Sequence, residues 1–242
     1  MQMLSKLTRW RQLRRLGQLT QGASLTCLML WSLLLTGSAA QAQVFPVRGE
    51  PDAPVTIVMF SAFHCRYCAE AKKGLDQLMA KHGGKVNLVF KHFPLSNDEA
   101  GYLPHYAALA AGEQGKFWEM HDALFAHQNG LDDAQKVRSL AQQLKLDMAR
   151  YDVALSKHAG SERIKADLAD ANAFKVVATP TFYIDGYKFE GVQQEAVFDL
   201  MIAHKAGGVT ESKLQQVIKA SKNANASPLV ERLLKQANTP QK

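Results

Sequence analysis

Two cysteines three positions apart, Cys65 and Cys68, lie between an apolar run and a helical pattern, and this arrangement constrains the fold most. The run "VTIVMF", Val55 to Phe60, is β-branched and does not alternate with polar residues, which is typical of a strand buried on both faces. The next apolar residues recur at spacings of three and four and predict a helix that ends at Gly83-Gly84: Cys68, Ala71, Leu75, Leu78 and Met79. A second apolar run, Val86 to Phe90, completes a predicted β-α-β unit of an α/β fold.

The predicted unit places Cys65 at the end of a strand and the start of a helix. Unpaired backbone N–H groups and the positive end of the helix dipole favour a thiolate there. With the nearby cations of Arg66 and His64, we expect the Cys65 pKa to fall by about one to two units. Cys68 lies one turn further along the same face, so it can form a disulfide with Cys65. Stabilising the thiolate stabilises the reduced pair and makes its disulfide more oxidising.

The cysteine pair has three interpretations. A structural disulfide would close a four-residue loop, which contributes only about 2 kcal/mol. A zinc site would need further ligands, but the sequence has no second cysteine pair and no His-x-x-x-His pattern among the available histidines, His64, His92, His105, His121 and His127. The strand-turn-helix setting favours the third interpretation, a redox dithiol that uses no metal or organic cofactor.

Residues 1–42 predict a secretory signal peptide. Basic residues without any acid precede an apolar run, Ala23 to Thr36, and Ala40-Gln41-Ala42 offers a cleavage site. An uncleaved membrane anchor is the alternative, but the run is shorter than the roughly 18–20 residues that span a bilayer. Cleavage would remove Cys27 and leave Cys65 and Cys68 in an oxidising compartment, periplasmic or otherwise outside the cytoplasm.

Removing this leader changes the charge balance. Five of the 29 basic residues lie in it, so 24 remain against 22 acidic residues. No basic cluster or basic-aromatic stripe is present, so we expect no nucleic-acid partner.

A second signature lies far downstream in "VVATPTFYIDGYKFEG", Val176 to Gly191. Asp185-Gly186 separates two short β-type runs, which predicts a tight hairpin. Thr179-Pro180 stands at the entry to the first of these strands, a position that proline tolerates.

Four motifs in order, "FSAFHCRYC", "KHFPLS", "AALAAGEQGKFWEMHDALFAHQ" and "ATPTFYIDG", resemble the DsbA-like thioredoxin-fold family of exported thiol-disulfide oxidoreductases, over roughly residues 47–204. The resemblance implies an α/β, thioredoxin-like fold with an inserted helical subdomain. The expected division is a signal peptide (1–42), a first core part (43–96), a helical insertion (97–175), a second core part (176–206) and a C-terminal helical extension (207–242).

The same resemblance implies roles for individual residues. Cys65 resembles the exposed nucleophile and Cys68 the buried resolving thiol. Pro180 resembles a cis-proline that faces the dithiol, and Thr179 the residue whose backbone pairs with an extended substrate and whose hydroxyl can contact the sulfur. The remaining candidates for tuning the site or binding substrate lie beside the cysteines: His64, Arg66 and Tyr67.

The sequence also departs from the family pattern. Met59 and Ala62 occupy positions where many relatives have acidic residues, and Arg66 replaces a common proline. A buried carboxylate could assist proton transfer from Cys68, so this chain would need water or another group for that purpose.

The resemblance implies a monomeric oxidase that introduces disulfides into unfolded exported proteins and is reoxidised by a quinone-linked membrane partner. The short segment before the first predicted core strand favours this interpretation. A reductase or isomerase is the alternative, since a threonine like Thr179 also precedes the cis-proline in isomerase-type relatives. A redox-inert peptide- or metal-binding protein is a further alternative. The extension would pack on the domain or dock a partner through two helices, around Leu214 and around Leu233.

Overall fold

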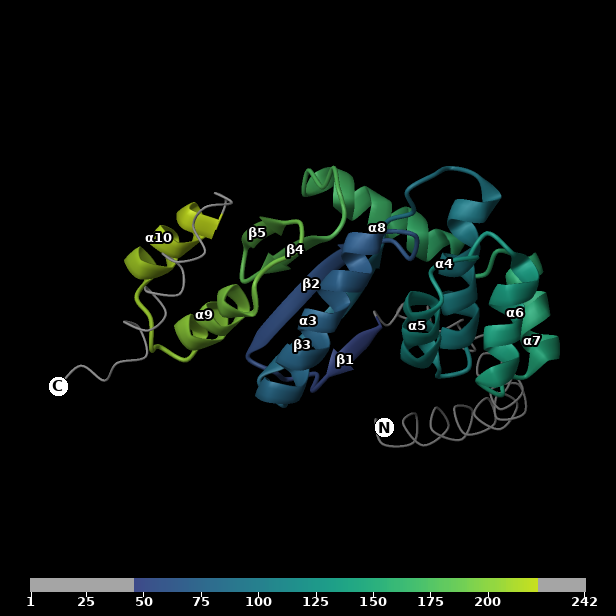
Figure 1. Cartoon of the computed structure of the whole chain (residues 1–242), viewed down its shortest axis with the longest axis horizontal. Coiled ribbons are helices and arrows are strands. Elements are labelled where there is room, and N and C mark those ends of the chain that lie inside the picture. The colour runs from purple at the N-terminus through teal and green to yellow at the C-terminus, as the bar shows by residue number, and fades with distance from the viewer. Residues whose placement is uncertain (1–45, 222–242) are drawn as a thin grey trace, which may run out of the picture. The chain divides into compact units, whose positions relative to one another are not determined.

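A computed structural model describes residues 46–221 of the chain (Figure 1). The predicted signal peptide and the second predicted helix of the extension lie outside these residues. The described strands form one sheet in the order β1-β3-β2-β4-β5. Only β2 and β3 pair in parallel, as a β-α-β unit requires, and the other pairs are antiparallel. The bounds are β1 Val47–Gly49, β2 Val55–Ser61, β3 Val86–His92, β4 Thr181–Ile184 and β5 Tyr187–Glu190.

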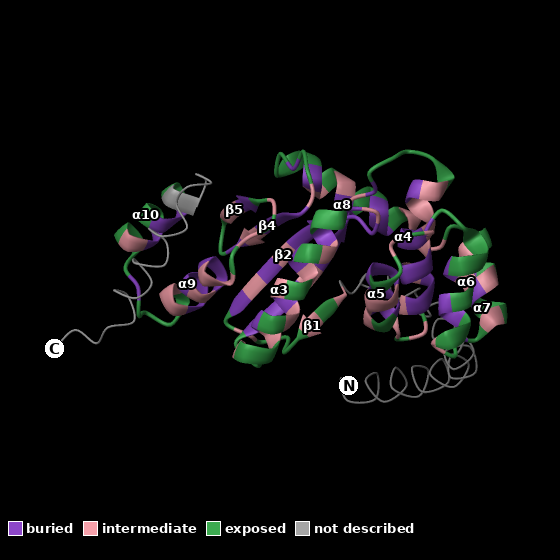
Figure 2. Cartoon of the chain, viewed as in Figure 1, coloured by how far each residue is buried: buried purple, intermediate pink, exposed green. Residues whose placement is uncertain are grey.

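Helix α3, Arg66–His82, connects β2 to β3 and covers one face of the sheet (Figure 1). Its buried side consists of Cys68, Ala71, Leu75 and Leu78, so the predicted apolar stripe is confirmed (Figure 2). Gly83 follows the helix, and Gly84 then has a φ of 74°, in the left-handed region that glycine adopts without strain. Helix α9, Glu195–Lys205, packs beside α3 and also contacts β2.

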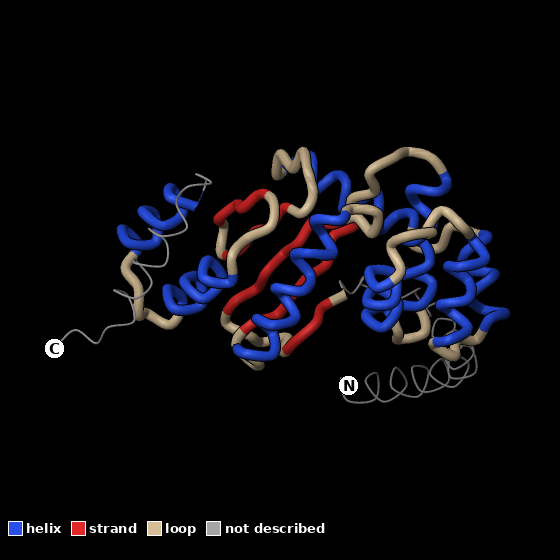
Figure 3. Tube along the Cα trace, in the orientation of Figure 1, coloured by secondary structure: helices blue, strands red, loops and turns tan. Residues whose placement is uncertain are grey.

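The chain between β3 and β4 forms five helices (Figure 3). They are α4 Glu99–Gly112, α5 Phe117–Ala126, α6 Ala134–Gln143, α7 Met148–Ser156 and α8 Ser161–Ala173. An aspartate precedes three of them, and its carboxylate accepts hydrogen bonds from N–H groups of the first turn: Asp98, Asp133 and Asp147. The sheet order, together with the helices between β3 and β4, confirms the predicted thioredoxin-like fold with inserted helices.

Helix α8 is fixed to β3 by a buried charge cluster. The Asp167 carboxylate, which is fully buried, lies 3.1 Å from Lys91 Nζ and 3.1 Å from Arg163 Nε. It also accepts the backbone N–H of His92 at 2.9 Å. Asp170 forms a further ion pair with Lys91. Removing one member of such a cluster would leave a buried charge unbalanced, so the contact strongly favours this one arrangement.

The hairpin predicted at Asp185-Gly186 is present between β4 and β5. Both residues have positive φ, 47° and 85°, as a two-residue turn that matches the twist of the strands requires. Strand β1 was not predicted, and the expectation that the sheet begins at Val55 is wrong. The strand has only three residues and is largely exposed, so it gives no hydrophobic pattern in the sequence.

Helix α10, Glu211–Ser221, packs on α9 through Leu214 and Val217, as predicted for the first helix of the extension. Among residues 46–221, every helix is too short or too polar to cross a bilayer.

Candidate active site

The two cysteines lie where β2 gives way to α3. Cys65 is the residue before the helix and has an extended backbone, with φ −82° and ψ 112°. Its carbonyl oxygen accepts the N–H groups of Cys68 at 3.0 Å and Ala69 at 3.2 Å, which begins the helix. The Cys65 sulfur therefore lies at the positive end of α3, with Cys68 one turn inside.

Both cysteines are free thiols, but they differ in exposure. Cys68 is 0% exposed and Cys65 is 7% exposed, so both are buried, and the expectation that Cys65 is an exposed thiol is wrong. Cys65 is covered because its sulfur lies against the Thr179 backbone, 3.5 Å from the carbonyl oxygen, to which it donates only while the thiol is protonated. Of the two sulfurs, Cys65 is the one that a partner could reach.

The site separates the two thiols by charge as well. The Cys65 pKa is lowered to about 5, chiefly because the Cys68 thiol donates a hydrogen bond to its sulfur. Burial opposes this shift, while the Thr179 side chain and the N–H groups of Cys68 and Tyr67 add to it. The Cys68 pKa is raised, first by burial and then by its hydrogen bond to Cys65. At neutral pH the pair therefore holds one thiolate and one thiol.

We expect replacement of Cys68 to raise the Cys65 pKa, by an amount that depends on the substitute. Cys68→Ala removes the main donor and should raise it by more than about one unit, whereas Cys68→Ser keeps an O–H donor and should raise it less. The pH profile of iodoacetamide alkylation measures both values. Equal profiles for alanine and serine would contradict a hydrogen bond from position 68.

The Thr179-Pro180 peptide bond is cis. The segment is held by two hydrogen bonds: Thr181 Oγ1 donates to the Ala178 carbonyl at 2.7 Å, and Gly191 N–H donates to the Pro180 carbonyl at 2.8 Å. The Thr179 side chain lies close enough to the Cys65 sulfur to lower its pKa, and within the described part of the chain the buried Thr179 hydroxyl has no other hydrogen-bond partner. The sequence thus brings Thr179 and Pro180 to the cysteines across more than a hundred residues.

The other three candidates also lie beside the cysteines, but two of them engage other partners. His64 Nε2 is 3.0 Å from Asp132 Oδ1, in the turn between α5 and α6. The Arg66 guanidinium lies 4.5 Å from the centroid of the Tyr67 ring and donates to the Tyr67 hydroxyl at 2.6 Å. Hydrogen bonds from Cys68, Thr179 and backbone N–H groups, rather than the Arg66 charge, are the principal causes of the lowered Cys65 pKa. Tyr67 is 48% exposed.

Gln128, just after α5, is a site residue that the sequence analysis missed. Its Nε2 donates to the carbonyl oxygens of Phe63 at 2.6 Å and Cys65 at 3.0 Å. Gln128 ends the third motif quoted for the family resemblance, but it lies more than 60 positions from the loop and no spacing rule connects the two, so the contact could not be predicted. Asp132 was missed for the same reason.

Met59 and Ala62, which stand where many relatives have acidic residues, are buried apolar side chains. The polar group nearest in sequence is Ser61, whose buried hydroxyl favours the thiolate of Cys68 and opposes the upward shift of its pKa.

A cluster of buried histidines lies beneath the active-site loop and packs around the Phe63 and Phe90 rings. His92 Nδ1 and His105 Nδ1 are 2.8 Å apart, so one ring donates to the other. Burial lowers the pKa of His105 to about 3 and of His121 to about 4, and that of His92 well below its ordinary value. These rings are therefore neutral near pH 7.

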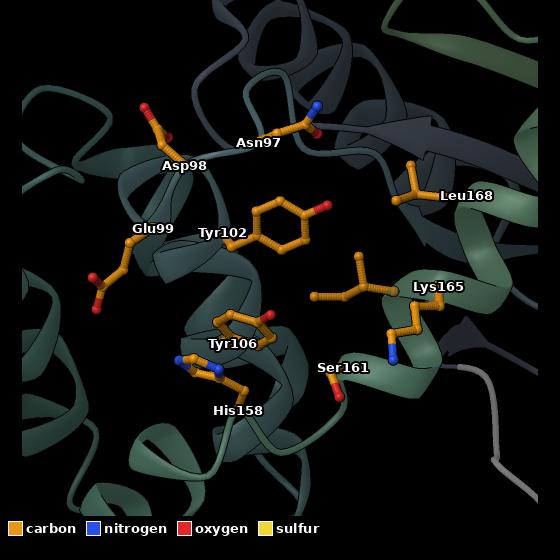
Figure 4. A pocket seen from close by; sticks show the side chains of 10 residues that line it. Asn97, Asp98, Glu99, Tyr102, Tyr106, His158, Ser161, Lys165 and Leu168 are labelled. Atoms are coloured by element: carbon orange, nitrogen blue, oxygen red, sulfur yellow. The ribbon is translucent and has the colours of Figure 1, made fainter.

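A cavity of about 520 Å³ lies between α4 and α8 (Figure 4). Neither Cys65 nor Cys68 lines it. Tyr102 and Tyr106 of α4 and Lys165 and Leu168 of α8 line it, and the Tyr106 ring stacks on His158 with 4.7 Å between the ring centroids. Within residues 46–221, no three His, Cys, Asp or Glu side chains converge as metal ligands.

Comparison with known proteins gives the class of this site. A family model described as Thioredoxin matches residues 42–204. A thioredoxin-like oxidoreductase from Silicibacter pomeroyi has 25% identity and a TM-score of 0.61, covering 69% of this chain and 94% of that structure. DsbA2 from Pseudomonas aeruginosa has 27% identity and a TM-score of 0.57, covering 68% and 96%. The chain therefore belongs to the thioredoxin family, in its DsbA-like group of thiol-disulfide oxidoreductases.

A curated relative is longer than this chain. The Na(+)/H(+) antiporter NhaA 3 of Salinispora tropica is 39% identical over 146 residues, which are 60% of this chain and 22% of the antiporter. The chain thus spans less than a quarter of the length of that relative.

Proposed function

We propose that the chain is an exported oxidase that introduces disulfides into secreted or periplasmic proteins through Cys65 and Cys68. The observation that carries this proposal is the asymmetry of the pair: Cys65 has a pKa of about 5, and Cys68 is fully buried with a raised pKa. A thiolate this stable is a good leaving group, which favours transfer of the disulfide to a substrate.

In the proposed reaction, a substrate thiolate attacks the Cys65 sulfur of the oxidised pair. The Cys65–Cys68 bond breaks, a mixed disulfide forms, and Cys68 leaves with the bonding electrons and takes up a proton. A second substrate thiolate then attacks the substrate sulfur of the mixed disulfide and releases Cys65 as its thiolate. Two substrate thiols are oxidised and the pair gains two electrons. The proposal includes no metal or organic cofactor.

Unfolded polypeptides are the proposed substrates. Apolar side chains flank the site without being buried: Tyr67 beside the cysteines and, 80% exposed, Val177 two residues before Thr179. Exposed apolar surface of this kind suits partners that have not buried their own. We propose that Thr179 and Pro180 align an extended substrate, and that His64, Arg66 and Tyr67 adjust the contact.

Export rests on the predicted signal peptide at residues 1–42 and on the need to return the Cys65–Cys68 pair to its disulfide after each cycle, which an oxidising compartment allows. One fold relative is described as a periplasmic thioredoxin-like protein from Salmonella enterica, which accords with the same location. A membrane-bound oxidant would restore the Cys65–Cys68 disulfide after each cycle. The match to the antiporter covers too little of that protein to bring ion transport into the proposal.

A direct comparison of two reactions tests the direction of electron flow. The oxidised chain should form disulfides in a reduced, unfolded model protein faster than it repairs the same protein with scrambled disulfides. Faster repair of the scrambled protein would favour the alternative, an isomerase or reductase using the same residues.

The Cys68→Ser variant provides a second test, because it lacks the thiol that resolves a mixed disulfide. We expect it to accumulate covalent complexes with exported proteins in an oxidising compartment, visible as bands that disappear on reduction. The Cys65→Ser/Cys68→Ser variant is the control and should form none. Absence of complexes with Cys68→Ser would contradict a substrate oxidase.

A further inference from the structure

The active-site loop is attached to the helical insertion by contacts on its backbone as well as on its side chains. The Phe63 ring is fully buried and lies 5.1 Å from the Phe125 ring of α5 and 5.3 Å from the Phe90 ring of β3. Gln128, which follows α5, donates from one nitrogen to the carbonyls of Phe63 and Cys65. The same short stretch of chain thus holds both the side chain and the backbone of the loop.

The Cys65 carbonyl has a central place in this arrangement. It accepts the N–H groups of Cys68 and Ala69 and so forms the first turn of α3. Gln128 donates to the same oxygen, and its second donation, to Phe63, fixes the peptide group two residues earlier. The orientation of the Cys65 residue is therefore determined from both sides.

We propose that Gln128 is a positioning residue for Cys65, whose two amide N–H groups hold the loop in the shape that keeps the Cys65 sulfur at the start of α3. This inference rests on the proposed thiol-disulfide chemistry of Cys65. Backbone N–H groups of Tyr67 and Cys68 stabilise the thiolate only while the loop keeps that shape. Loss of the Gln128 donors should therefore weaken the thiolate without removing any group that touches it.

Gln128→Met tests the proposal, because methionine keeps the length of the side chain and lacks the N–H donors. We expect the Cys65 pKa to rise by about half a unit to one unit, a roughly three- to tenfold weaker preference for the thiolate. The equilibrium constant with glutathione should shift by a similar factor towards the disulfide, which for tenfold is about 30 mV in reduction potential. Gln128→Glu should shift both quantities further, because its carboxylate faces two carbonyl oxygens and adds negative charge near the thiolate.

Gln114→Met is the matched control. Gln114 also ties its side chain to a backbone, donating to the Asp147 carbonyl at 3.1 Å and accepting the Asp147 N–H at 2.8 Å, but within the helical insertion. It should lower the unfolding midpoint about as much as Gln128→Met and leave the Cys65 pKa and the reduction potential unchanged.

The wild-type chain separates failure of this inference from failure of the proposed function. If wild type alkylates with a low pKa and exchanges with glutathione while both Gln128 variants match it, Gln128 has no positioning role. If wild type shows an ordinary thiol pKa and no exchange, the proposed function itself is wrong. A shift in the Gln128 variants and in Gln114→Met alike would show a general effect of stability and would also overturn the inference.

Discussion

The Cys65→Ser variant is expected to lose thiol-disulfide exchange with small disulfides and with reduced protein substrates by at least about 1,000-fold. A serine hydroxyl does not ionise near neutral pH and forms no disulfide, while Cys68 is fully buried and cannot take over. The rate of glutathione exchange, followed by the mass of the mixed disulfide, measures this loss.

The control is Cys68→Ser, which keeps the reachable sulfur. It should still form one mixed disulfide with glutathione and stop at that stage. Exchange by Cys65→Ser at more than a tenth of the wild-type rate would show that Cys68 is reachable, contrary to its burial.

We expect the second large effect in the pH dependence of stability. The folded Cys65 pKa is lowered to about 5 from an ordinary value of about 9, so the reduced chain gains stability that is complete above the unfolded pKa and is lost as pH falls towards 5. At pH 7 this gain is on the order of 3 kcal/mol, and it vanishes below pH 5. The oxidised chain has no thiol to ionise and lacks the gain entirely.

Denaturant unfolding of both redox forms at pH 5, 6, 7 and 8 measures the difference. The reduced form should gain on the oxidised form by about 1.4 kcal/mol per pH unit across this range. The buried histidines also destabilise both forms in acid, because their lowered pKa values oppose protonation in the folded state, but they cancel in the difference. A difference that does not change with pH would contradict a stabilised Cys65 thiolate.

Periodicity was sufficient to predict much of the sheet and its cover. The β-branched run at Val55, the helix stripe from Cys68 and the Asp185-Gly186 turn each have a local cause, so each was visible in the sequence. Strand β1 has no such local cause. Its three residues adopt the strand conformation because they pair with β3. Its existence depends on tertiary contact alone.

The site divides in the same way. The placement of Cys65 at a helix start follows from local pattern, whereas the approach of Thr179 and Pro180 came only from resemblance to a family. Gln128 and Asp132 were invisible because each contacts the loop through one side chain across a long separation in sequence. The cations expected to stabilise the thiolate turned out to have other partners, Tyr67 and Asp132, which a linear sequence cannot indicate.

The charge cluster around Asp167 has a mechanical consequence. It fixes the last inserted helix to the C-terminal end of β3, and Gln128 fixes an earlier inserted segment to the loop at the end of β2. A hinge motion that swung the helices away would separate a buried carboxylate from its cations, at a cost of several kcal/mol. The insertion and the sheet should therefore move as one rigid body, so adaptation to different substrates is left to exposed side chains near the cysteines such as Tyr67 and Val177.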